Sequence, residues 1–164
     1  MNRAELDRLV QEFTITDDAL KKQTIAHQVW DEAEKRGIYP ASIQGLYEAR
    51  GKGECLGFTV PAMNLRTLTY DLASAIFRVA KKINASAFIF EIARSEMGYT
   101  DQKPLEYSSV VLAAALREGF SGPVFIQGDH FQINAKKYKA DPKAEVDGLK
   151  KIIKEAIEAG FFNI

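Results

Sequence analysis

A run of polar side chains follows an apolar stretch in VFIQGDHFQINAKKY (residues 124–138), and its central pair is Asp129 and His130. A carboxylate in this position can act as a general base, and a neutral imidazole can bind a divalent metal. The pair therefore favours proton transfer beside a metal ion. The same two residue types also serve as turn and capping residues after a strand, which is the simpler alternative.

Polar residues also follow the two apolar runs that precede this one. Asn64 ends the first run, and Glu91 and Arg94 lie at the end of the second. Parallel α/β folds gather functional side chains at the carboxyl ends of their strands, so we expect Asn64, Glu91, Asp129 and His130 to converge there. An unpaired carboxylate in an apolar strand is costly, and pairing of Glu91 with Arg94 is the simpler explanation for its presence.

Other residues that could bind a ligand or a metal give weaker signals. Lys136 and Lys137 could meet a phosphate, although two lysines in a loop are commonly solvated. His27 is the only other histidine, and we interpret it as structural because no second metal ligand lies near it on its predicted helix. The sequence contains no nucleophile elbow, CxxC, HExxH or EF-hand pattern.

Apolar runs alternate with amphipathic segments from residue 55 onward. This alternation predicts a parallel sheet with crossover helices, in which the three strands lie side by side in chain order. Their near-continuous apolar character is typical of strands buried on both faces. The final FFNI resembles the opening of a fourth strand. We expect strands at 55–63, 86–93 and 123–128, and helices at 65–83, 104–118 and 143–159.

Two parallel folds fit this pattern, an open doubly wound sheet and a (β/α)8 TIM barrel. The first strand–helix turn, TVPAMNLRT, lacks a glycine-rich phosphate loop, which weakens a nucleotide-binding interpretation. Four strands are half of a barrel, so we expect residues 54–164 to be the first βα units of a TIM barrel within a longer polypeptide. Residues 1–53 are expected to form an N-terminal helical extension, with helices at 3–13, 17–36 and 42–51 and with Thr16 as an N-cap.

The composition is that of an ordinary globular protein, with 46% hydrophobic and 27% charged residues among 164. Acidic and basic side chains balance at 22 each, so no nucleic-acid or membrane partner is expected. The N-terminus carries early acids and lacks the apolar core of a signal peptide. With a single cysteine, Cys55, the chain has no internal disulfide, and a cytoplasmic location is expected.

Three segments resemble the class II (metal-dependent) fructose- and tagatose-bisphosphate aldolases over residues 42–164. GFTVPAMN places Asn64 where the family's first strand ends in asparagine, and IQGDHF places Asp129 and His130 in its H-x-D-H pattern. SIQGLYEARGKGECLGFTVPAMN resembles the helix that leads into that strand. Gln127 replaces the first histidine of the pattern, and Phe131 replaces a small residue after it.

The resemblance implies a zinc-dependent aldolase that cleaves a ketose 1,6-bisphosphate through a dihydroxyacetone-phosphate enediolate. Asp129 would then be the acid–base group and His130 a Zn2+ ligand, while Asn64, Glu91 and Gln127 would contact a small phosphorylated sugar. Further zinc ligands are expected beyond Ile164, so this chain alone is expected to be inactive. A homo-oligomer is also expected to be possible. A non-catalytic assembly subunit of a tagatose-bisphosphate aldolase and an unrelated TIM-barrel isomerase are the open alternatives.

Overall fold

A four-stranded parallel sheet forms the centre of the molecule, and a computed structural model describes all residues from 1 to 164. Its order is β1-β4-β3-β2, and every neighbouring pair is parallel. The predicted adjacency of the three later strands is confirmed, with helices as the crossovers. The strands are β1 (Ile38–Ala41), β2 (Ala62–Asn64), β3 (Ile89–Ala93) and β4 (Gly122–Asp129).

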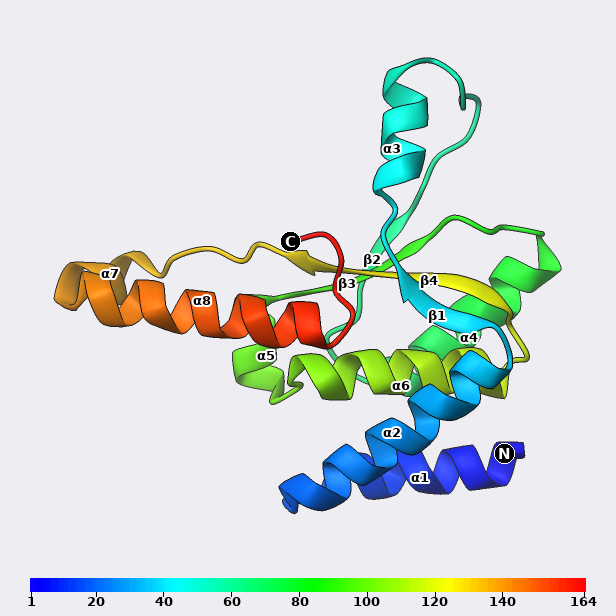
Figure 1. The fold of residues 1–164 in the computed structure, drawn as a ribbon, viewed down its shortest axis with the longest axis horizontal. Coiled ribbons are helices and arrows are strands. Elements are labelled where there is room, and N and C mark those ends of the chain that lie inside the picture. The colour runs from blue at the N-terminus through cyan, green and yellow to red at the C-terminus, as the bar shows by residue number, and fades with distance from the viewer.

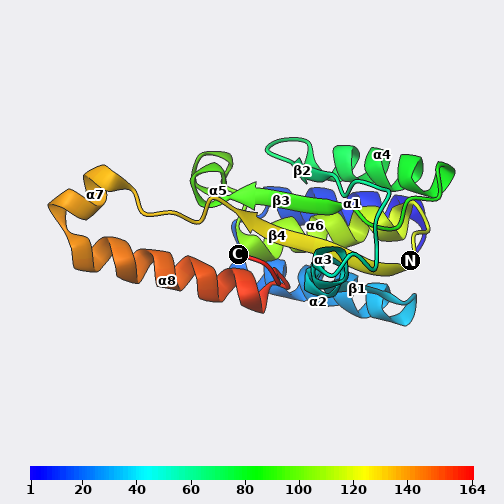
Figure 2. The same ribbon diagram turned by 90° about the horizontal axis from the view of Figure 1, so that it is seen from above.

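Helices cover one face of this sheet. Figure 1 shows α1, α2 and α6 on one side of it, with α3 standing on the other side. In Figure 2 the sheet lies in front of α1, α2 and α6, while α7 and the first half of α8 extend past its end. The helices are α1 (Arg3–Ile15), α2 (Ala19–Lys35), α3 (Gln44–Gly51), α4 (Thr69–Lys82), α5 (Arg94–Thr100), α6 (Pro104–Arg117), α7 (Ala135–Ala140) and α8 (Pro142–Glu158).

The core lies between the helices and the covered face of the sheet. α6 occupies its middle, and residues 107–116 of that helix are all buried because α1, α2, α4 and the sheet surround them. A helix that is buried on every side is expected only in such a position. From α4, Phe77 packs its ring 5.1 Å from that of Phe90 in β3 and 4.8 Å from that of Phe120.

The N-terminal region is not wholly helical, contrary to expectation. β1 pairs with β4 from Ile38 opposite Gly122 to Ala41 opposite Phe125, so residues before 54 contribute an edge strand. Gly37, with φ of 69°, ends α2 and turns the chain into this strand. The strand has four residues and contains Pro40. Such a short segment shows no periodicity, and an edge strand tolerates a proline that cannot donate to the ladder.

Several predicted boundaries were also wrong. The strand that pairs with β3 is Ala62–Asn64, so only two residues of the expected strand 55–63 belong to it. The expected loops after β3 and β4 contain the short helices α5 and α7. The N-cap of α2 is Asp18, which accepts hydrogen bonds from the Leu20 and Lys21 amides, whereas Thr16 accepts from the Asp18 amide. Both types of side chain cap helices, so residue type alone does not decide between them.

The second face of the sheet has no layer of helices over it, and only α3 stands on that side, as Figures 1 and 2 show. The expectation of strands buried on both faces is therefore wrong in part. In β3 only Glu91 is partly buried, and Ile89 and Ala93, which share its face, are buried like Phe90 and Ile92 on the core side. None of the helices has the length and apolar character required to cross a bilayer.

Candidate functional site

Register places a row of polar side chains across the second face of the sheet. Asn64 is paired with Glu91, and Glu91 with Gln127. A single bridge adds Asn163, near the end of the chain, beside Gln127. Directly paired residues of parallel strands project to the same side, so these four side chains share one face. The Gln127 Nε2 donates to Glu91 Oε2 at 2.7 Å.

Asp129 lies at the carboxyl edge of this face and contacts two of the predicted site residues. Asn64 Nδ2 donates a hydrogen bond to Asp129 Oδ2 at 3.0 Å, and His130 Nε2 lies 3.1 Å from Asp129 Oδ1. The Asp129 side chain is 25% exposed and that of His130 is 69% exposed. A neighbouring strand and the following residue thus hold the carboxylate while solvent and small molecules can still reach it.

The turn after β4 determines where His130 points. His130 has φ of 48°, a left-handed backbone that non-glycine residues seldom adopt and that often occurs at functional sites. Two residues before it, Gly128 leaves room for the Phe131 ring, since a Cβ at that position would lie 2.5 Å from a ring carbon. The chain can therefore fold back tightly after Asp129, and a hydrogen bond from Gln132 N to His130 O closes the turn at 2.8 Å.

The pairing of Glu91 with Arg94, the simpler alternative for Glu91, does not occur. Glu91 bonds to Gln127 across the sheet, whereas Arg94 Nη1 lies 2.6 Å from Glu145 Oε1 and donates to the Gln132 carbonyl at 3.0 Å. Arg94 is the first residue of α5, which leaves the sheet, so its side chain does not follow the face of β3. The structure thus brings together Asn64, Asp129 and His130, and places Glu91 and Gln127 beside them as a separate pair.

Sequence reasoning missed Glu96, a buried residue of α5 that bonds to the end of β3 next to this site. Its side chain accepts a hydrogen bond from the Ala93 amide at 2.9 Å and pairs with Arg66, and only 7% of the residue is exposed. Burial acts to raise the pKa of Glu96, but hydrogen bonds from the Ala93 amide, Arg66 and Asn64 outweigh it and hold the pKa below its ordinary 4.5. The N-cap residue is Ala93, which has no side-chain oxygen, so the sequence carries only the glutamate half of a capping box and gives a weak signal for this residue.

The residues at the site do not form a complete zinc centre. Catalytic zinc requires three protein ligands, and the structure contains no group of three histidine, cysteine, aspartate or glutamate side chains placed to hold a metal ion. At this edge the plausible ligands are Asp129 and His130 alone. If zinc binds here, its remaining ligands must come from another polypeptide segment.

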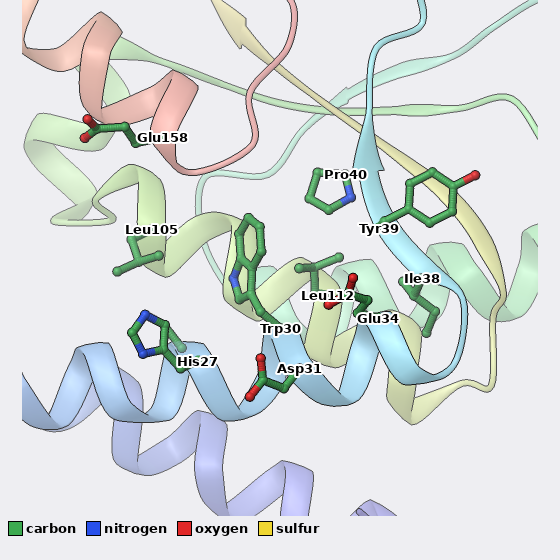
Figure 3. A pocket seen from close by; sticks show the side chains of 11 residues that line it. His27, Trp30, Asp31, Glu34, Ile38, Tyr39, Pro40, Leu105, Leu112 and Glu158 are labelled. Carbon is green, nitrogen blue, oxygen red and sulfur yellow. The ribbon is translucent and has the colours of Figure 1, made fainter.

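The second histidine, His27, lies far from this edge on the helical side of the sheet. It lines a pocket of about 500 Å3 between α2, β1 and α6, shown in Figure 3. Trp30 lines the same pocket, and its Nε1 donates to Ser109 Oγ at 3.0 Å. His27 therefore contributes nothing to the Asp129 site.

Comparison with models of known protein families, with curated proteins and with solved structures finds no match to this chain. No family is therefore assigned, and the residues and their geometry carry the functional argument.

Proposed function

We propose that Asp129 is the proton-transfer group of a metal-assisted ketose-bisphosphate aldolase and that His130 is one of its zinc ligands. The observation that carries this proposal is the position of the Asp129 carboxylate at the carboxyl edge of a parallel sheet. It faces the side of the sheet that has no covering layer of helices, and Asn64 and His130 hold it there. Carbon–carbon cleavage next to a carbonyl requires a carboxylate or imidazole fixed in such an accessible place.

Because helices cover only one face of the sheet, its strands fit the first strands of a TIM barrel. A barrel carries its helices outside and its functional side chains at the carboxyl ends, whereas a doubly wound sheet has helices on both faces. The end of the chain also pairs with β4, on the same edge as β1 but nearer the carboxyl end of β4. Phe162 N donates to Ile126 O at 3.3 Å, and Gly128 N donates to Asn163 O at 2.8 Å. A following barrel strand would pair in parallel with β4 along this edge, of which β1 already occupies residues 122–125.

Asn64 would both orient the base and contact the substrate. Its amide nitrogen donates to Asp129, while its Oδ1 is buried without a hydrogen-bond partner. A buried acceptor without a partner is costly, and a sugar hydroxyl would satisfy it after a turn of the Asn64 side chain that opens Oδ1 to the ligand. Asp129 would exchange a proton with a hydroxyl or carbon acid bound beside it. The proposal requires zinc ligands in addition to His130.

The same shortage of ligands favours a second candidate, a non-catalytic assembly subunit of a tagatose-bisphosphate aldolase. Only one histidine lies at the edge, and no three-ligand group exists in the chain. Zinc binding separates the candidates, because the assembly subunit needs no metal. In either case the 164-residue chain by itself is expected to bind zinc no more tightly than micromolar and to cleave no ketose bisphosphate.

The test is cleavage of fructose and tagatose 1,6-bisphosphate by a protein that joins this chain to the strands that complete the barrel. Asp129→Asn should lower kcat about 100-fold with zinc retained, since it removes only proton transfer. His130→Ala should remove the metal. Asp147→Asn, an exposed change on α8, is the matched control and should have no effect. Activity in excess chelator, or unchanged turnover in Asp129→Asn, would refute the aldolase mechanism.

A further inference from the structure

A second cavity adjoins the Asp129 site on the side of α5. It has a volume of about 380 Å3 and lies between α5, the turn after β4, α7 and the middle of α8. His130 lines it, so the cavity and the carboxylate meet at the same imidazole. Its size is within the range of about 300–1,000 Å3 that small-molecule sites occupy. Met97 and Ile152 supply apolar contacts.

The charged side chains that line this cavity are all basic. They are Arg94, Lys103 and Lys137, and no carboxylate is among the lining residues. Glu145 and Asp101 lie at its margin, where they bind Arg94 at 2.6 Å and Lys103 at 3.2 Å. The cavity therefore presents cations to a ligand and keeps the compensating acids outside.

Arg94 and Lys137 differ in how they are held. Arg94 is 21% exposed and is fixed by Glu145 and by the Gln132 carbonyl. The Lys137 ammonium makes no ion pair or hydrogen bond within the chain, so all of its donors are free. Its backbone is nevertheless fixed, because Asn134 Oδ1 accepts from the amides of Lys136 and Lys137 at 3.1 Å each. Of these two lysines, Lys137 lines the cavity and Lys136 does not.

We propose that this cavity binds the phosphate group of a small phosphorylated substrate and thereby places the neighbouring carbons at Asp129. A lysine ammonium with free donors is a common partner of phosphate, and a fixed arginine adds charge and direction. The cavity exceeds the volume of a bare phosphate and can hold a chain of a few carbons. The identification of the ligand as a sugar phosphate rests on the proposed function, whereas the binding of a phosphate monoester does not.

The test uses the 164-residue chain without metal, titrated with glycerol 3-phosphate and with inorganic phosphate and followed by 15N NMR. Saturable shifts are expected in residues 94–98 and 130–137. Lys137→Ala should weaken glycerol phosphate binding about tenfold, as expected for one charge-assisted hydrogen bond, and Lys137→Arg should restore most of it. Lys136→Ala removes the same charge one residue away and should change affinity less than about twofold.

Equal weakening by Lys136→Ala and Lys137→Ala would overturn the site, because it would show only a general attraction of anions to α7. Shifts confined to other regions, or an absence of saturation, would overturn it as well. Circular dichroism of each variant checks the fold, which alanine in an exposed helix preserves.

The outcome is separable from that of the aldolase proposal. Phosphate binding that depends on Lys137, found in a barrel-completed protein that cleaves no ketose bisphosphate, would reject the aldolase and retain this site. Cleavage with the same KM in wild type and in Lys137→Ala would retain the aldolase and reject this phosphate site.

Discussion

Replacing Glu96 with glutamine tests whether a buried charge supports the site. The carboxylate accepts the Ala93 amide at 2.9 Å at the point where β3 becomes α5, and it also binds Arg66. Glutamine keeps the shape and one acceptor oxygen but removes the charge. The variant should therefore fold and lose only the charged part of these interactions.

The expected cost follows from the hydrogen bond to the Ala93 amide. Hydrogen bonds to charged groups contribute about 1.5–3 kcal/mol, against about 0.5–1.5 kcal/mol for neutral ones. Glu96→Gln should therefore lower the free energy of unfolding by about 1–2 kcal/mol at pH 7. The Arg66 side chain is exposed and its pair is screened, so it adds little. Glu96→Ala should cost about 1–3 kcal/mol more, because it leaves the Ala93 amide buried without an acceptor.

The pH dependence provides a second readout. The folded pKa of Glu96 is below its ordinary value of 4.5, so its contribution is fully present above pH 4.5 and is lost as the pH falls through the folded pKa. Glu96→Gln does not titrate. The difference between wild type and variant should therefore close on acidification, which urea denaturation at pH 7 and pH 3, followed by circular dichroism, would measure.

Two results would refute this reasoning. One is a Glu96→Gln variant as stable as wild type at pH 7, and the other is a difference that persists or grows at pH 3. Glu158→Gln, an exposed change at the end of α8, is the control and should alter stability by less than about 0.5 kcal/mol at either pH.

Two further substitutions test the turns around the sheet. Gly160→Ala should lower the free energy of unfolding, measured by urea denaturation, by about 2–3 kcal/mol. Gly160 has φ of 80°, and a Cβ there would lie 2.8 Å from Pro40. Gly45→Ala is the control and should not destabilise the chain, because a Cβ at Gly45 meets nothing within 4 Å. His130→Gly should be at least as stable as wild type, since φ of 48° suits glycine, whereas His130→Ala keeps that backbone strain and should be less stable than His130→Gly by about 1 kcal/mol. An alanine variant at 130 as stable as the glycine variant would contradict the strain.

The order of strands and helices could be read from the sequence, because the signals for it are local. Apolar runs of strand length alternate with amphipathic segments, and the alternation alone implies parallel strands joined by helices. The polar residues at strand ends were recognisable for the same reason. Asn64 and Asp129, 65 positions apart, meet because parallel strands that start together also end together.

Partnerships between side chains depended on the tertiary structure. Glu91 bonds to Gln127, and not to its sequence neighbour Arg94, because the register of β3 against β4 places Glu91 and Gln127 opposite each other and α5 carries Arg94 away. The register depends on how two strands pair, so it cannot be read from the sequence of either strand alone.

The edge strand β1 and the one-sided cover of the sheet were also decided only in three dimensions. Residues 38–41 are too few to show a period, and they become a strand because the edge of β4 is available to them. The two faces of the sheet differ because α1, α2, α4 and α6 pack on the same side. Periodicity identifies which residues of a strand share a face, but the packing of distant helices determines which face is buried and which is left open to a ligand.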